Sequence, residues 1–160
     1  MSHNAPMVHV DVLGVRQRQG EREIVVLLLD GASELVVPIV VGPREANAIA
    51  TAQSGMTAPR PMTHDLLCDV LEAVQVQLTC AEIVALDDGV FYAELVLSNG
   101  QRLDARASDA IAVAIRTHSP VLCSAEVVAT SGVEVVSGRQ REDLERFRTF
   151  LDHVVPEDFT

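Results

Sequence analysis

The first third of the chain contains hydrophobic patterns typical of strands, followed by one typical of a helix. Residues 8–12 alternate apolar and polar side chains, as a half-buried strand does. Residues 24–29 and 35–41 are two continuous apolar runs, and the turn residues between them predict a β-hairpin. Pro38 lies within the second run, which favours an edge strand or a bulge there. A helix is expected to start at Pro43 and to have a small-residue inner face.

A similar order of elements follows in the second half of the chain. Thr63 is expected to cap a helix whose apolar side chains form a stripe up to Val74. Asn99-Gly100 is a strong hairpin-turn signal, and Ser108 is expected to cap an almost entirely apolar helix over residues 109–117. The strands predicted in this half are 81–86, 90–97, 101–107 and 121–123.

A short internal similarity indicates that part of the chain is duplicated. Residues 45–50 (EANAIA) resemble residues 109–114 (DAIAVA), and each copy follows a predicted hairpin. A repeated β-β-α unit explains this match, although six small residues can also match by chance. The pattern predicts an α+β fold with a mixed, largely antiparallel sheet and packed helices. We expect a domain over residues 1–137, followed at 138–160 by an amphipathic helix and tail.

Composition narrows the environment of the protein and its partners. Apolar residues make up 48% of the 160 residues, and aromatic residues only 3%, so the core is expected to consist of Val, Leu, Ile and Ala. The net charge of −11 opposes nucleic-acid binding unless a basic patch or a metal ion offsets it. Three cysteines without metal-ligand spacing indicate reduced thiols. Without a signal peptide or a membrane-length apolar run, we expect a soluble, cytoplasmic protein.

Two acidic residues hold equivalent places at the starts of the repeated helices. If the fold brings Glu45 and Asp109 together, the two carboxylates would suit a divalent cation in a phosphoryl-transfer site. The alternative is that each carboxylate only complements the positive end of its own helix. The sequence leaves both interpretations open.

The segment Pro59 to Asp65 contains further candidates. His64 is not explained by helix capping, and imidazole can serve as a general base or a metal ligand near neutral pH. Arg60 lies between two prolines, so its guanidinium would be presented rigidly to a phosphate, although a plain surface role fits as well. Asn47 and Arg44, in the first turn of the earlier helix, are candidate ligand contacts.

Several motifs together resemble a known family, the bifunctional nuclease domain. They occur in the expected order, cover about residues 8–135, and the closing segment is also similar to that of bacterial members. The motifs are Pro38-Ile39-Val40-Val41-Gly42-Pro43-Arg44-Glu45-Ala46-Asn47-Ala48-Ile49, Arg60-Pro61-Met62-Thr63-His64-Asp65-Leu66-Leu67, Asp88-Gly89-Val90-Phe91-Tyr92-Ala93 and Asp104-Ala105-Arg106-Ala107-Ser108-Asp109-Ala110-Ile111-Ala112.

The resemblance implies cleavage of phosphodiester bonds in RNA, DNA or both. On this interpretation His64, Glu45 and Asp65 are the candidate catalytic residues. Arg60, Asn47 and Arg44 would bind the substrate. Glu45, Asp65 and Asp109 would bind a Mg²⁺ or Mn²⁺ ion. Two alternatives remain: a non-catalytic regulatory module, expected to be a homo-oligomer, and a small-molecule binder with a pocket at the helix starts.

Overall fold

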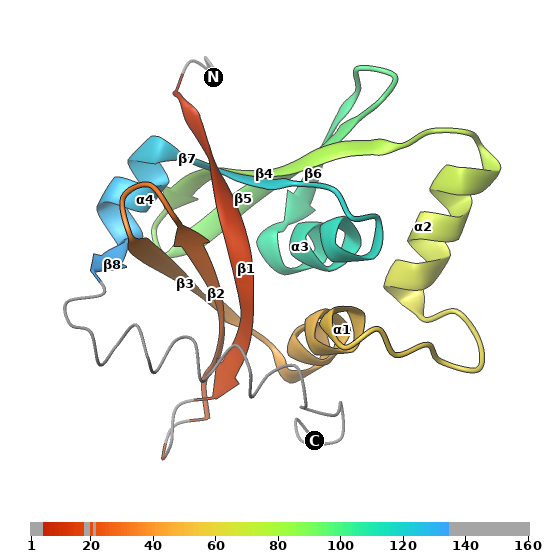
Figure 1. The fold of residues 1–160 in the computed structure, drawn as a ribbon, viewed down its shortest axis with the longest axis horizontal. Helices are drawn as coiled ribbons and strands as arrows, with labels where there is room; N and C mark the ends of the chain where they lie inside the picture. Colours follow the sequence, from red (N-terminus) through yellow and green to blue (C-terminus); the bar gives the residue numbers. More distant parts are fainter. Residues whose placement is uncertain (1–4, 18–19, 21, 135–160) are drawn as a thin grey trace.

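The computed structural model describes residues 5–17, 20 and 22–134, within which the chain forms an eight-stranded sheet and four helices (Figure 1). The strand order is β6-β5-β4-β7-β1-β2-β3-β8, and only the β4–β7 pair is parallel. The predicted α+β class, with its largely antiparallel sheet, is therefore confirmed. The strands are β1 (Met7–Gln17), β2 (Ile24–Asp30), β3 (Leu35–Val41), β4 (Leu78–Asp87), β5 (Val90–Leu97), β6 (Arg102–Arg106), β7 (Val121–Ser124) and β8 (Val133–Glu134).

The first hairpin forms where the apolar runs predict it. The Asp30 carboxylate closes its turn by accepting hydrogen bonds from the Ala32 amide at 3.1 Å and the Ser33 hydroxyl at 2.6 Å. On its outer side β3 pairs with β8 only at Leu35 and Val36. Within the described residues, Pro38 therefore faces an open edge, which suits a residue without an N–H group.

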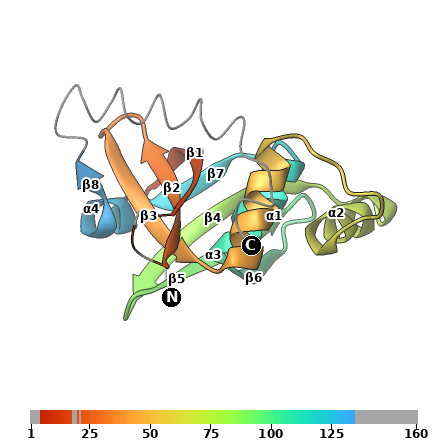
Figure 2. The same ribbon diagram turned by 90° about the horizontal axis from the view of Figure 1, so that it is seen from below.

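Two similar units make up most of the fold. A meander of β1, β2 and β3 leads into α1 (Pro43–Gln53), and a meander of β4, β5 and β6 leads into α3 (Ala107–Arg116). The units flank β7 in mirrored strand order, with β1 and β4 running in opposite directions. Helices α1 and α3 lie side by side (Figures 1 and 2). This arrangement supports the proposed duplication and extends the repeat to β-β-β-α.

Small residues allow the two helices to pack closely against the sheet. In α1 the buried residues are Ala46, Ile49 and Ala50, which form the small inner face that the sequence predicts. Gln53 is half-buried and donates a hydrogen bond to the Val12 carbonyl at 3.1 Å. Helix α3 is buried on nearly every side, as its apolar sequence predicts. Its buried residues are Ala107, Ser108, Ala110, Ile111, Ala112, Val113 and Ala114.

Two predicted helix caps are wrong by one or two residues. Helix α2 (Thr63–Ala73) is capped by Met62 rather than Thr63, because the Asp65 carboxylate accepts the Met62 amide and draws it into the first turn. Helix α3 is capped by Arg106 rather than Ser108, because the chain passes directly from β6 into the helix.

The apolar stripe of α2 lies largely at the surface. None of the residues in α2 is fully buried. Its exposed apolar residues are Leu66, Leu67 and Val70, with Met62 and Val74 at its two ends, and we call these five the α2 stripe. Helix α2 lies at the opposite end of the molecule from β8 and α4 (Ala125–Ser131) (Figures 1 and 2).

The remaining sequence predictions concern the thiols, the membrane and the C-terminal segment. All three cysteines are free, and burial raises the pKa of the Cys123 thiol to about 12. None of the helices in the described part of the chain has the length and apolar character needed to cross a bilayer. The amphipathic helix and tail predicted at 138–160 lie outside the described residues.

Candidate active site

The equivalent acidic residues of the two units meet at a single arginine. Arg106 donates from Nε and Nη2 to the Asp109 carboxylate, at 2.8 and 3.1 Å, and from Nη1 to Glu45 at 3.1 Å. Glu45 lies in the first turn of α1 and Asp109 in the first turn of α3, so the contact joins both units. The Arg106 side chain remains 65% exposed. The fold thus brings Glu45 and Asp109, whose proximity the sequence leaves open, to a single guanidinium.

His64 completes the cluster from a third helix. From the first turn of α2, its Nε2 lies 2.9 Å from Asp109 Oδ1, and its side chain is only 17% exposed. An ionised carboxylate only accepts hydrogen bonds, so Nε2 must carry the proton in this pair. In a neutral ring the lone pair is then on Nδ1. We call Glu45, His64, Arg106 and Asp109 the site cluster.

Charge neighbours keep the central carboxylate ionised. Burial by itself would raise the pKa of Asp109, but the hydrogen bonds from Arg106 and His64 outweigh it and hold that pKa below its usual value. The hydrogen bonds that Arg106 makes with Asp109 and, to a smaller extent, with Glu45 raise the pKa of Arg106. Asp109 is therefore a fixed acceptor that orients two side chains at once.

The third acidic candidate, Asp65, has a different partner. Its Oδ1 accepts a hydrogen bond from Arg116 Nε at 2.7 Å, and its Oδ2 accepts the Met62 amide at 3.0 Å. The Arg116 contact is the main reason that the pKa of Asp65 is lowered. Asp65 follows His64 in the chain, yet one of its oxygens joins α2 to α3 and the other caps α2.

A solvent-open pocket of about 500 Å³ adjoins the site cluster and shares Glu45 and Arg106 with it. Its walls come from the end of β3, the turn into β5 and the start of α3, so both units contribute. The volume lies within the range of small-molecule sites, roughly 300–1,000 Å³.

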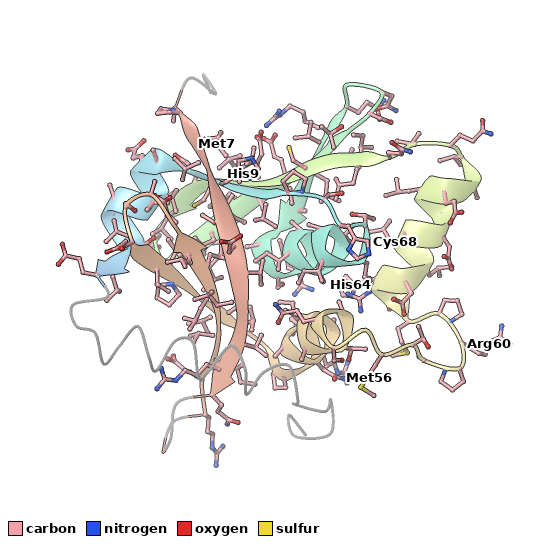
Figure 3. The ribbon with its side chains drawn as sticks, in the orientation of Figure 1. Met7, His9, Met56, Arg60, His64 and Cys68 are labelled. Carbon is pink, nitrogen blue, oxygen red and sulfur yellow. The ribbon has the colours of Figure 1, made fainter. Side chains whose placement is uncertain are left out.

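Three predicted contact residues lie outside this cluster. The Asn47 amide oxygen accepts a hydrogen bond from the Thr51 hydroxyl within its own helix, at 3.4 Å. Arg44 is exposed and does not line the pocket. Arg60 is at the tip of the loop before α2, where its side chain points away from the rest of the protein (Figure 3). The structure therefore brings together Glu45, His64 and Asp109, and leaves Arg44, Asn47 and Arg60 apart from them.

Two arginines central to this geometry were not predicted from the sequence. Arg106 lies three residues before Asp109, a spacing at which opposite charges can pair at a helix start. That spacing was the available signal for it. Arg116 pairs with Asp65 across 51 residues, a contact that no local pattern reveals.

The side chains as arranged do not fit a site for Mg²⁺ or Mn²⁺. Such ions need several oxygen ligands around one point. Within residues 5–17, 20 and 22–134, no group of three or more His, Cys, Asp or Glu side chains is placed to hold a metal ion. Glu45 and Asp109 share Arg106, and Asp65 binds Arg116. The metal ion therefore stays a prediction.

Comparison with known proteins identifies the family. The sequence profile of the bifunctional nuclease domain matches residues 26–136. An uncharacterised protein of Mycobacterium tuberculosis is 36% identical over 161 aligned residues, which cover 96% of this chain and 98% of that protein. The bifunctional nucleases of Oryza minuta and Oryza sativa subsp. japonica are 26% identical over 131 residues, covering 78% of this chain but 39% of theirs. The chain belongs to the bifunctional nuclease domain family.

Proposed function

We propose that this protein hydrolyses phosphodiester bonds of RNA, DNA or both, with His64 as the acid–base residue and Arg106 as the phosphate contact. The family assignment and the names of the plant relatives support the reaction class. The observation that carries the assignment of residues is the 2.9 Å contact between His64 Nε2 and Asp109, next to an exposed guanidinium.

In this mechanism Nδ1 of His64 takes a proton from the attacking water as the water oxygen bonds to phosphorus. The P–O ester bond breaks, and the leaving oxygen receives a proton from the imidazolium, which restores neutral His64. Asp109 holds the ring in the required tautomer and is close enough to stabilise the positive charge that forms. Positioned acid–base groups of this kind contribute roughly 10²–10⁴-fold to rate.

Arg106 supplies positive charge where the phosphoryl oxygens gain negative charge. Its guanidinium has five N–H groups, and the contacts with Glu45 and Asp109 use three of them. Two N–H groups therefore remain for a phosphate. Glu45 acts here as a positioning residue, because it fixes the outer edge of the guanidinium.

A direct test is a cleavage assay on single-stranded RNA and DNA with purified wild type, His64→Ala and His9→Ala. His9 is an exposed histidine on β1 and is the matched control. We expect His64→Ala to lose roughly 10²-fold or more of the activity, and His9→Ala to keep it. Equal activity of His64→Ala and wild type would contradict the proposal.

The same assay decides the predicted need for a metal ion. Each protein is measured in EDTA and again with Mg²⁺ or Mn²⁺. Activity that vanishes in EDTA and returns with either ion would confirm the prediction of a divalent cation. Activity retained in EDTA would show that prediction to be wrong, while leaving the roles of His64 and Arg106 in place.

One observation favours a second candidate, a non-catalytic oligomeric module. The α2 stripe is a row of exposed apolar side chains at helical spacing, a pattern common at protein–protein interfaces. This candidate predicts a concentration-dependent dimer in sedimentation experiments, weakened by Val70→Asp, and no nuclease activity in any buffer. A monomer at all concentrations would rule out self-association.

A further inference from the structure

The pocket beside the site cluster provides both apolar and polar contacts around one opening. Val40 at the end of β3 and Val90 at the start of β5 line it and are 60% and 53% exposed. Phe91, Arg106 and Ser108 also line the pocket. A planar apolar group can cover Val40 and Val90 while an attached anion reaches the guanidinium.

The overall charge of the chain does not favour the binding of a long polyanion. The chain carries a net charge of −11. Arg102, Arg106 and Arg116, three of its arginines, are already paired with carboxylates. Around Arg106, two carboxylates face one guanidinium, so the cluster creates no broad positive field. Tight binding of long nucleic acids rests on many phosphate contacts, and Arg102 and Arg116 contact carboxylates instead.

We infer that the pocket binds the base of a nucleotide substrate, so that the protein binds dinucleotides and short oligonucleotides about as tightly as long strands. The inference rests on the proposed function, since it names the substrate class of the same site. The base contacts Val40, Val90 and Phe91, and the phosphate on its sugar contacts Arg106. One or two phosphates then contact the protein directly, and the remaining nucleotides of a longer strand add little to the binding free energy.

The experiment measures binding and cleavage separately. Binding of the dinucleotide pApA and of an oligoadenylate of about 30 nucleotides is measured by calorimetry with His64→Ala, which lacks the proposed acid–base residue but keeps the pocket. Affinity is measured over a range of salt concentrations, because the slope of log K against log [salt] reports the number of phosphate contacts. Cleavage of both substrates is measured with wild type.

The pocket predicts similar affinities for the two ligands and a shallow slope of about −1 for each. Val90→Asp, in the His64→Ala background, is expected to weaken pApA binding about tenfold or more, because a carboxylate replaces an apolar contact near the phosphate. Leu103→Asp is the matched control, since Leu103 is an exposed apolar residue on β6 outside the pocket lining. It should bind pApA as the parent protein does.

Two results would overturn the inference: a long strand bound far more tightly with a steep salt slope, or pApA affinity unchanged by Val90→Asp. Failure of the proposed function gives a different result. In that case pApA binds and Val90→Asp weakens it, but wild type cleaves neither substrate.

Discussion

The two β-β-β-α units pack in the same way but differ in their chemistry. Ala46, Ile49 and Ala50 of α1 are buried, and so are their counterparts Ala110, Val113 and Ala114 in α3. The acid in the first turn also recurs, as Glu45 and Asp109. The residue before each helix does not: it is Gly42 in one unit and Arg106 in the other.

That one difference gives the site its asymmetry. A Cβ atom at Gly42 would overlap the Glu45 carboxylate, so the absence of a side chain leaves room for Glu45 beside its own helix start. In the second unit the equivalent residue is a long cation that bridges both acids. The repeat therefore supplies two carboxylates, and a single departure from the repeat supplies the charge between them.

The largest effect on activity is expected from replacing Arg106, the residue at which the second unit departs from the repeat. Arg106→Gln keeps part of the side chain but leaves Glu45 and Asp109 without their shared cation. We expect nuclease activity to fall roughly 10²–10³-fold, as it does when a group that stabilises transition-state charge is lost. Arg102→Gln is the matched control, because Arg102 also bridges two carboxylates, Glu82 and Glu94, but lies outside the site cluster. Equal losses in both variants would indicate a merely structural role.

A smaller effect, on the free energy of unfolding, is expected from the difference in burial between α1 and α3. Ala112 of α3 is fully buried, whereas Ala48, its counterpart in α1, is half-buried. Ala112→Leu should lower the free energy of unfolding by about 1–3 kcal/mol through overpacking. Ala48→Leu should cost less than half of that. Urea denaturation measures both, and equal costs would show that the helices are packed alike.

The smallest effect concerns the dependence of stability on pH. Because the pKa of Asp109 is lower in the folded state than its usual value of 3.8, its ionised form stabilises the protein above that pH. This contribution is lost as the pH falls through the lowered folded pKa. The difference in free energy of unfolding between wild type and Asp109→Asn should therefore shrink between about pH 5 and about pH 2. Urea denaturation at several pH values tests this, and a constant difference would contradict it.

Local pattern predicted the elements built from short-range signals. The apolar runs at 24–29 and 35–41 and the Asn99-Gly100 turn each gave a strand pair, and the match between 45–50 and 109–114 indicated the repeat. The caps were misplaced because Met62 and Arg106 occupy cap positions without the usual capping side chains.

The site was predicted only in part, for a physical reason. Glu45, His64 and Asp109 each had a local signal, the first and last as acids at helix starts and His64 as an unexplained imidazole. The contact that organises them, between Arg106 and Glu45, spans 61 residues and depends on how α1 and α3 meet. The exposure of the α2 stripe likewise depends on which side of α2 faces α3, and the spacing of the apolar residues does not determine this.

The most direct test of the account is a double-mutant cycle between His64 and Asp109, measured as kcat/KM for cleavage of a dinucleotide. If Asp109 orients His64, then the double variant His64→Ala/Asp109→Asn should lose little more activity than the weaker of the two single variants. The loss in the double variant should fall far short of the product of the two single losses. Losses that multiply, or full activity in Asp109→Asn, would contradict the claim that the two residues act as one unit.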